Sequence, residues 1–233
     1  MTKISVIIPT LNEQEGVGRA IASVSFADEV VIADGGSTDE TVAVAQKLGA
    51  RIISARPGRG YQLRAGAAEA TGDVLLLLHA DNWMGEDCGS QLVSYLTSLE
   101  TNESNESNES RKLFGCFRQE IDDPRYRFRL LEGGNAFRAR TFGVPYGDQA
   151  IFVDRASYER AGGIPDVPLM EDVLLSRRLR KIVGKPELLE GPVHVSPRRW
   201  QHDGVIRRTL RNWSIVSAFA IGVSPERLAK WYR

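Results

Sequence analysis

The amino-acid sequence predicts an α/β protein with a single, mostly parallel, Rossmann-like sheet flanked by helices. Strand-like and helix-like segments alternate through the first hundred residues with short connections, a pattern that means right-handed crossovers and parallel strands. The segment Val74 to Leu78 is wholly aliphatic, as expected of a strand covered by helices on both faces. Apolar residues make up 42% and charged residues 26% of the 233, a balance that favours one ordinary globular core.

The first hundred residues are expected to contain four strands and three helices. The strands are predicted at 4–8, 29–33, 51–55 and 74–78, and the helices at 13–25, 38–48 and 62–70. Ser37 or Thr38 is the expected N-cap of the second helix, and Gly49 is its expected stop. The small residues at 65–68 imply close packing of the third helix on the sheet.

The second half of the chain is less regular. The repeat TNESNESNES at 101–110 has no apolar side chain and is predicted to be an exposed loop. Strands are expected at 113–118 and 150–153, and helices at 126–139, 172–182, 203–219 and 225–232. Because this half is expected to extend the same sheet, residues 1–233 are predicted to form one domain, with halves at 1–100 and 111–200 and a helical tail at 201–233.

Charge is balanced overall but not along the chain. Thirty basic and thirty acidic residues argue against a nucleic-acid binder. From Arg198 to Arg233 there are eight Lys or Arg residues against Asp203 and Glu226. This basic tail suits phosphates or an anionic membrane surface, or it is a solvated helical face. Whether it contacts a membrane or the second subunit of a homodimer is left open.

Cysteine usage and hydropathy indicate the cellular compartment. Cys88 and Cys116 show no disulfide spacing, and no run of 18 apolar residues is present. No signal-peptide pattern precedes the first strand. We therefore expect a cytoplasmic protein with free thiols.

The most informative motif is HADN at 79–82, directly behind the aliphatic strand. Open α/β sheets bind ligands at the carboxyl ends of their strands, and folding alone does not require His79 and Asp81 there. Asp81 is a candidate ligand for Mg²⁺ or Mn²⁺, hard cations that bridge carboxylate and diphosphate oxygens. The motif predicts a site that holds a divalent cation against a phosphorylated substrate.

Two other loops follow strands at the same predicted edge. PTLNE at 9–13 is either a ligand loop or an ordinary exit turn. Asp34 ends the second strand and is followed by Gly35 and Gly36, which allow close approach of a ligand to the backbone. An acid there suits a nucleobase N–H edge or a ribose hydroxyl, and the alternative is a tight strand-to-helix turn.

Charged side chains suited to phosphate or proton chemistry occur at three further places. Arg59 and Arg64 stand near the start of the third helix, where guanidinium groups and the helix dipole favour phosphate; the alternative for either arginine is a surface role. Glu171 and Asp172 open a later helix, either as dipole-stabilising residues or with one of them as a general base. The segment RRW at 198–200 suits a phosphate-bearing leaving group and stacking on a ring.

The order of these motifs is more specific than any one of them. PTLNE, DGGSTDE, a strand with an acidic end, ED and RRW together resemble family 2 of the inverting nucleotide-sugar glycosyltransferases, over most of the chain from Ser5 to Trp200. GDQAIFV at 147–153 and SPRRWQHDG at 196–204 are similar to the bacterial radical-SAM/selenodomain-associated members, some of them linked to arsenosugar biosynthesis. The resemblance implies the GT-A fold, with 1–100 as the nucleotide-binding half and 111–200 as the acceptor and catalytic half.

The resemblance also implies roles for residues. Asp81 matches the last acid of the family's DxD motif, a metal ligand, whereas His79 stands in place of the first acid, so that strict metal dependence is left open. Asp172, beside Glu171, matches the ED pair that supplies the catalytic base. Together with the loop motifs, the residues predicted to bind the nucleotide sugar are Pro9, Thr10, Asn12, Glu13, Asp34, Gly35, Arg59, Arg64, Asp81, Arg198, Arg199 and Trp200.

The sequence interpretation is therefore metal-assisted, inverting transfer of a sugar from a nucleoside diphosphate sugar to a hydroxyl acceptor. Its first alternative is a non-catalytic nucleotide-sugar-binding module, which His79 in place of an acid favours. A nucleotidyltransferase is less well supported, because PTLNE is not a glycine-rich loop with a lysine or arginine, and no G-x-G-x-x-G of a dehydrogenase follows the first strand. The sugar, the base and the acceptor are left open.

Overall fold

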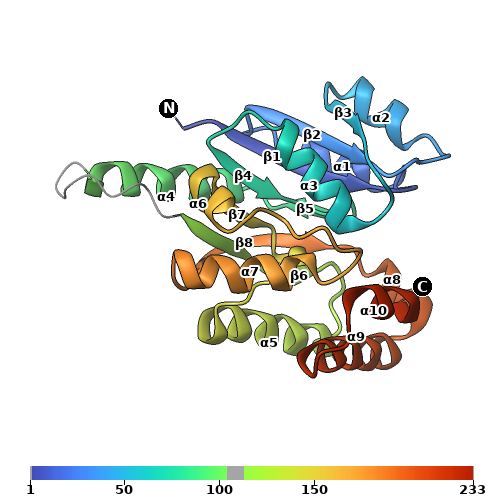
Figure 1. Ribbon diagram of the computed structural model, residues 1–233. Helices are drawn as coiled ribbons and strands as arrows, with labels where there is room; N and C mark the ends of the chain where they lie inside the picture. Colours follow the sequence, from blue (N-terminus) through green and yellow to red (C-terminus); the bar gives the residue numbers. More distant parts are fainter. Residues whose placement is uncertain (1, 104–112, 233) are drawn as a thin grey trace.

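The computed structural model describes residues 2–103 and 113–232, with the side chains of 102, 103, 199, 202, 203, 205, 206 and 232 outside the description. The described chain forms an eight-stranded sheet in the order β3-β2-β1-β4-β7-β6-β8-β5 (Figure 1). The strands are β1 Ile4–Thr10, β2 Glu29–Asp34, β3 Arg51–Ser54, β4 Val74–Leu77, β5 Asn82–Met84, β6 Phe114–Ile121, β7 Ile151–Asp154 and β8 Glu187–Val195. The helices are α1 Val17–Ala22, α2 Thr41–Lys47, α3 Arg59–Glu69, α4 Cys88–Glu103, α5 Tyr126–Phe142, α6 Arg155–Arg160, α7 Glu171–Ile182, α8 Arg198–Asp203, α9 Val205–Ala220 and α10 Pro225–Tyr232, with the 3-10 helix η1 at Gly147–Gln149.

The sheet has a parallel part and a mixed part. Strand β1 pairs in parallel with β2 and with β4, and β2 pairs in parallel with β3. Strand β7 runs antiparallel to β4 and continues the sheet through β6, β8 and β5. Four of the seven pairings are parallel, the fourth being β6 with β8. The predicted fold class, a mostly parallel α/β sheet into which the second half of the chain extends, is confirmed.

The central strands are buried on both faces, as the aliphatic sequence at 74–78 predicts. Val6 and Ile8 of β1 belong to a hydrophobic cluster that includes residues of α1 and α4. Ile7 belongs to a second cluster that includes residues of α3 and α7. A Cβ on Gly66 of α3 would lie 2.4 Å from Ile7 Cγ2, so the close packing predicted from the small residues at 65–68 is also confirmed.

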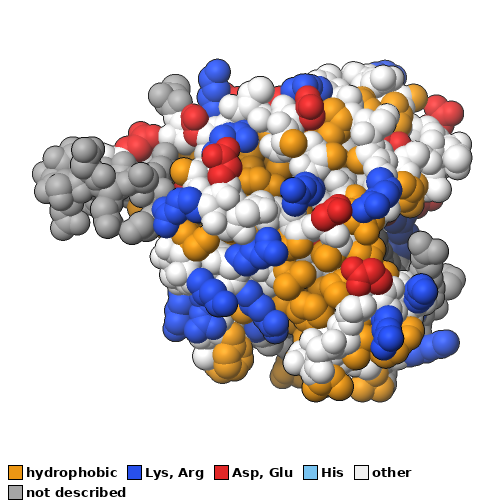
Figure 2. Space-filling model, in the orientation of Figure 1, with side chains coloured by type: hydrophobic (Ala, Val, Ile, Leu, Met, Phe, Trp, Pro, Cys, Tyr) orange, Lys and Arg blue, Asp and Glu red, His pale blue; other side chains and the backbone are white. Residues whose placement is uncertain are grey.

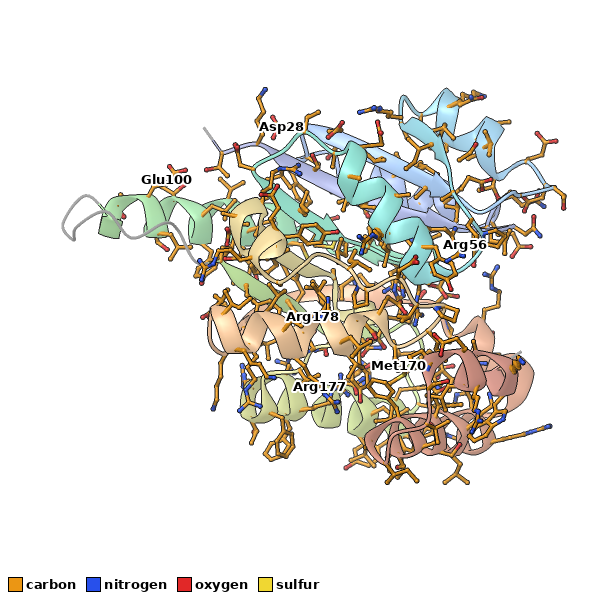
Figure 3. All side chains as sticks on the ribbon, in the orientation of Figure 1. Asp28, Arg56, Glu100, Met170, Arg177 and Arg178 are labelled. Carbon is orange, nitrogen blue, oxygen red and sulfur yellow. The ribbon has the colours of Figure 1, made fainter. Side chains whose placement is uncertain are left out.

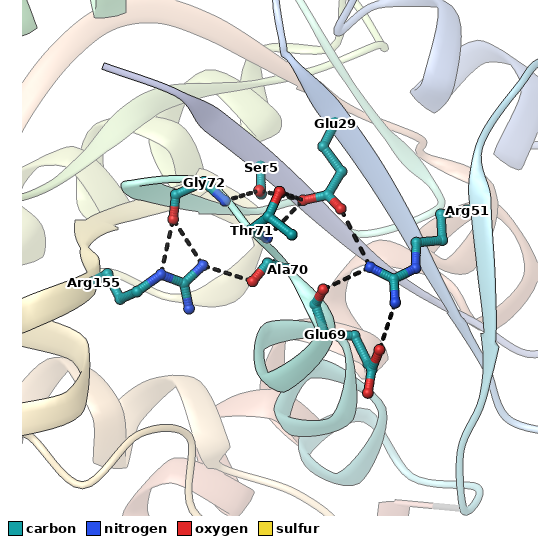
Figure 4. Close-up of polar contacts among 8 residues, drawn as sticks. All are labelled: Ser5, Glu29, Arg51, Glu69, Ala70, Thr71, Gly72 and Arg155. Atoms are coloured by element: carbon teal, nitrogen blue, oxygen red, sulfur yellow. Dashed lines mark hydrogen bonds and ion pairs between the residues drawn. The ribbon is translucent and has the colours of Figure 1, made fainter. Parts of the chain in front are cut away.

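Charged side chains connect the strands at the amino-terminal edge of the sheet (Figure 4). Glu29, at the start of β2, accepts a hydrogen bond of 2.6 Å from Ser5 Oγ, and Arg51 at the start of β3 lies 3.5 Å from its other carboxylate oxygen. Arg155, at the start of α6, donates to the carbonyl oxygen of Gly72, just before β4. These contacts stabilise the edge opposite to the one where the predicted site residues lie.

The start of α2 differs from the prediction. The helix begins at Thr41, and Glu40 occupies the N-cap position without a side-chain hydrogen bond, so neither Ser37 nor Thr38 caps it. Ser37 Oγ instead donates to Asp34. Such local hydrogen bonds compete with helix capping, and residue type alone does not decide between them. The predicted stop is confirmed, because the residue after the C-cap is a glycine with φ of 80°.

Several elements in the second half also differ from the predictions. Strands β5 and β8 and helices α4 and α6 were not expected, and β8 contains the Gly191–Pro192 pair, which reads as a breaker in the sequence. The loop predicted at 101–110 begins inside α4, which continues to Glu103, while 104–110 lie outside the described residues. The helix predicted at 203–219 corresponds to α9, Val205–Ala220, and the short helix α8 before it was not expected; Gly204, with φ of 80°, separates the two. None of the described helices is long and apolar enough to cross a bilayer.

Candidate active site

A cavity lies at the carboxyl edge of the sheet, where the loop after β4, the start of α7 and helices α5 and α9 meet. Its polar lining includes Arg59, His79, Asp81, Asp148 and Asp172. Figure 3 shows Met170, another lining residue, between α7 and the C-terminal helices. The apolar wall consists of Ile121, Leu131, Leu169, Met170, Val173, Val195, Trp200, Trp213, Ile215 and Val216. Asp81 and Asp172 therefore share one cavity, as the hypothesis of a metal ligand near a base requires.

Gly147 lies between His79 and Asp172. A Cβ on this glycine would lie 2.6 Å from His79 Nε2 and 3.4 Å from Asp172 Oδ2. Its amide donates a hydrogen bond of 2.7 Å to Asp172 Oδ2. Because the residue has no side chain, the imidazole can approach closely while the backbone orients the carboxylate.

The turn before Asp172 is strained. Met170 precedes α7 with φ of 67° and ψ of 16°, in the left-handed region that non-glycine residues seldom adopt. Such a conformation persists only where the surrounding structure fixes it. Met170 is 5% exposed and packs in a cluster with Ile215 of α9 and Leu228 of α10. The C-terminal helices therefore stabilise the turn that presents Asp172 to the cavity.

The two acids of the ED pair have different surroundings. Glu171 is 1% exposed and forms an ion pair with Arg59 Nε. Burial raises the pKa of Glu171, and the adjacent Arg59 offsets this only in part. Asp172 lines the cavity, whereas Glu171 is not among the described lining residues. The catalytic roles of both stay predictions, and the geometry favours Asp172 as the carboxylate that reaches a ligand.

Asp148 is a cavity carboxylate that the sequence interpretation did not include. Gln119 Nε2 donates to its Oδ2 at 3.1 Å, and Asn82 Nδ2 donates to its carbonyl oxygen at 3.2 Å. Burial raises the pKa of Asp148; Arg138 lowers it, and the nearby Asp172 raises it further. The motif GDQ was noticed only as part of a family resemblance, since its contact with the loop after β4 depends on tertiary structure.

The first two predicted nucleotide loops are joined by hydrogen bonds. Asn12, with φ of 55°, accepts from the amide of Thr38 at 2.9 Å, and its own amide donates to Ser37 Oγ at 2.9 Å. Asp34 accepts from Ser37, from the amides of its own turn and from Thr10 Oγ1 at 3.1 Å. Burial raises the pKa of Asp34, but these hydrogen bonds outweigh burial and hold it below its usual value. The structure thus brings the two loops together.

Gln62 supports these loops from α3, a role that no sequence pattern indicated. Its Nε2 donates to the carbonyl oxygens of Thr10 at 2.6 Å and Ala33 at 3.0 Å, at the ends of β1 and β2. A Cβ on Gly35 would lie 3.1 Å from the same nitrogen, so a larger residue at this position would crowd the Gln62 side chain. Pro9 is buried within β1.

The C-terminal segment reaches both the first loop and the cavity. Arg198 Nη2 donates to Glu13 Oε2 at 2.8 Å and Nη1 donates to Glu15 Oε2 at 2.9 Å. Trp200 lines the cavity and packs edge-on against Phe128, with ring centroids 5.8 Å apart. Two predicted site residues, Glu13 and Arg198, therefore contact each other.

Two of the arginines predicted to bind phosphate are not placed in the cavity by the structure. Arg64 is exposed, its Nη1 donates to the carbonyl oxygen of Ile164 at 2.9 Å, and it is not among the described lining residues of the cavity. The side chain of Arg199 lies outside the described residues. Phosphate binding by either arginine stays a prediction.

The possible metal ligands among the described cavity residues are too few to enclose a cation, but they suit a cation that is also bound by the ligand. The described part of the chain has no group of three or more His, Cys, Asp or Glu side chains that would hold a metal ion. His79 and Asp81 line the cavity together. Mg²⁺ is commonly bound by one or two protein carboxylates, with substrate phosphates and waters completing its shell. The pair therefore fits a cation shared with a diphosphate ligand.

Comparison with known proteins finds similarity in the first part of the chain. Residues 5–102 match the family model described as Glycosyl transferase family 2. An uncharacterized glycosyltransferase of Rickettsia felis is 39% identical over 95 residues, which are 40% of this chain and 33% of that protein. Glucosyl-3-phosphoglycerate synthase of Mycolicibacterium smegmatis is 34% identical over 92 residues, 34% of this chain and 30% of that protein. The chain thus spans about a third of the length of these curated relatives.

Solved structures show the same fold over most of the chain. The crystal structure of S. aureus TarS in complex with UDP-GlcNAc covers 83% of this chain and 58% of its own, with a TM-score of 0.61 and 14% identity. Glucosyl-3-phosphoglycerate synthase from Mycobacterium tuberculosis, in complex with Mn²⁺, UDP and glucosyl-3-phosphoglycerate, covers 84% and 70%, with a TM-score of 0.54 and 20% identity. The expected GT-A fold is confirmed.

Proposed function

We propose that this protein transfers a sugar from a nucleoside diphosphate sugar to a hydroxyl acceptor, with inversion at the anomeric carbon. The observation that carries the proposal is the single cavity shared by Asp81 and Asp172. The family match over residues 5–102 supports glycosyl transfer, and the UDP and UDP-GlcNAc complexes of the structural neighbours make UDP-sugars the first donors to test. Membership of the radical-SAM-associated subgroup stays a prediction.

Asp172 is the proposed base. Held by the amide of Gly147, its carboxylate would take the proton of the acceptor hydroxyl as that oxygen attacks the anomeric carbon opposite the leaving group. Asp81, with His79, would hold a divalent cation, Mn²⁺ or Mg²⁺, which supplies positive charge to the diphosphate. Arg59 lines the same cavity, and its guanidinium would donate hydrogen bonds to the phosphate oxygens.

The other predicted site residues belong to the same proposal. The loop residues Pro9, Thr10, Asn12, Glu13, Asp34 and Gly35 would bind the nucleoside, and Arg64, Arg198, Arg199 and Trp200 would assist on the donor side. We also propose that residues 1–233 form a single domain and that the protein is cytoplasmic. Peripheral membrane contact through the basic tail and a homodimer are further parts of this proposal.

The substitution Asp172→Asn tests the base. Turnover is expected to fall roughly 10²- to 10⁴-fold, the usual effect of removing an acid–base group, while UDP binding is retained. Asp166→Asn is the matched control, because Asp166 is 67% exposed and pairs with Arg56 on the surface. If Asp172→Asn kept the full rate with the donor bound, another residue would have to be the base.

A second experiment separates the reaction classes. The protein is incubated with a panel of sugar nucleotides, with and without Mn²⁺, and melting temperature and products are followed. A ligand selective for the folded state raises the melting temperature. Release of nucleoside diphosphate supports glycosyl transfer, whereas release of pyrophosphate indicates nucleotidyl transfer. Binding of a sugar nucleotide that reacts neither with an acceptor nor with water indicates a non-catalytic binding module.

A further inference from the structure

Exposed apolar side chains gather on one side of the molecule. Among the described residues, eight of the eleven exposed large hydrophobic side chains lie on α5, on α9 and the residue after it, or on α10. They include Phe137 and Phe142 on α5, and Leu210, Trp213, Ile221 and Trp231 on the C-terminal helices. We call the exposed side chains of these three helices the outer face. Figure 2 shows hydrophobic side chains along the lower edge of the molecule, over α5 and α9.

The outer face is also strongly basic. The sequences of α5, α9 and α10 contain nine Lys or Arg residues and two glutamates, of which Arg208 and Glu132 are buried. The exposed cations include Arg127, Arg207, Arg227 and Lys230. Figure 2 shows Lys and Arg side chains on either side of the apolar lower edge.

Neighbouring acids do not cancel this charge. Asp123, just before α5, pairs with Arg125 at 2.6 Å, and Asp122 lies 3.8 Å from Arg19. On α5 itself, Arg140 is paired with Glu190 at 2.9 Å. The cations named above are additional to these pairs, so the outer face carries an excess of positive charge.

The outer face is continuous with the wall of the cavity. Trp213 is 63% exposed and also lines the cavity, and Leu131 of the cavity wall follows the exposed Leu130 on α5. An apolar surface therefore runs from the inside of the cavity, across Trp213, onto the exposed side of α9.

We propose that the outer face binds an anionic lipid bilayer. Exposed Trp, Phe and Leu side chains beside Lys and Arg are the composition of helices that lie in a membrane interface. An anionic headgroup layer complements the excess of cations, because each Lys or Arg near the surface is attracted to it. A second copy of the chain is a poorer occupant, because a symmetric interface would place the two basic faces against each other.

Flotation with vesicles tests this proposal independently of any transferase activity. The full chain is mixed with vesicles of phosphatidylcholine alone or of phosphatidylcholine with phosphatidylglycerol. The test variant is Arg207→Glu with Leu210→Ser, which changes an exposed cation and an exposed leucine on α9. The matched control is Lys47→Glu with Leu48→Ser, the same two kinds of change on exposed residues at the end of α2.

The expected result is binding to the anionic vesicles only, lowered on the order of tenfold or more by the α9 variant and unchanged in the control. Circular dichroism and melting temperature of both variants establish that they are folded. Three outcomes would overturn the proposal: no binding to either vesicle, an equal loss in the control, or a concentration-dependent dimer in sedimentation that Leu210→Ser alone abolishes.

Discussion

At the scale of single residues, Gly147 determines the positions of two proposed catalytic groups. The substitution Gly147→Ala would place a methyl group 2.6 Å from His79 Nε2, so the imidazole or the loop must move. We expect turnover to fall by about tenfold to a hundredfold, because displacements near 1 Å have effects of that size. Gly134→Ala is the control, since a Cβ there meets nothing within 4 Å. Unchanged kinetics in Gly147→Ala would contradict the assigned geometry.

The hydrogen bonds of Asp34 lead to a second prediction for a single residue, which concerns how the free energy of unfolding depends on pH. Its folded-state pKa is below the usual value, so its ionised form stabilises the fold above about pH 4, and this contribution is lost as pH falls through the folded-state value. Asp34→Asn should therefore be less stable than the wild type at neutral pH, with a difference that shrinks at acidic pH. Urea unfolding at both pH values measures this, and a difference of the same size at both would contradict the prediction.

At the scale of secondary-structure elements, two glycines in helices have opposite consequences. Gly66 of α3 packs against Ile7 of β1, so Gly66→Ala should lower the free energy of unfolding by about 1–3 kcal/mol through overpacking. Gly134 in α5 has no neighbour at its Cβ position, and Gly134→Ala should raise that free energy by about 0.5–1 kcal/mol through helix propensity. Chemical denaturation of both variants measures the two effects, and equal signs would show that α3 can move away from the sheet.

The same scale shows which elements a sequence can predict. The central strands were found because aliphatic runs such as 74–78 occur only where both faces are buried. Strand β8 was not, because Gly191 and Pro192 interrupt its pattern and only pairing with β6 and β5 makes it a strand. Helix α2 starts later than expected because Ser37 bonds to Asp34 rather than to the helix.

At the scale of the whole molecule, Arg198 connects the C-terminal helices to the first loop. Its side chain is 45% exposed, so the pairs with Glu13 and Glu15 contribute at most about 1 kcal/mol to stability. Arg198→Ala should leave the melting temperature nearly unchanged but weaken UDP binding by about fivefold, because the loop proposed to bind the nucleoside would lose the ion pair that holds Glu13. Calorimetric titration measures this, with Arg227→Ala as a control on α10. Equal affinities in all three proteins would remove Arg198 from the proposed donor site.

The candidate site was predictable where charged side chains stand just after a strand or at the start of a helix. His79, Asp81 and Asp172 were identified from local motifs, and the structure places all three in the lining of one cavity. Asp148, Gln62 and the apolar wall from α9 were missed because each acts through contacts between segments far apart in the sequence. Periodicity and spacing describe neighbours along the chain and carry no information about such contacts.

Trp213 belongs to an inner and an outer surface at once. A ligand that packs on this indole from within and a bilayer that covers it from outside, as proposed, would share one side chain, so their binding would be coupled. Thermodynamic reciprocity then requires that each changes the affinity for the other by the same factor. If the outer face binds a bilayer as proposed, substrate affinity is expected to differ between measurements with and without vesicles.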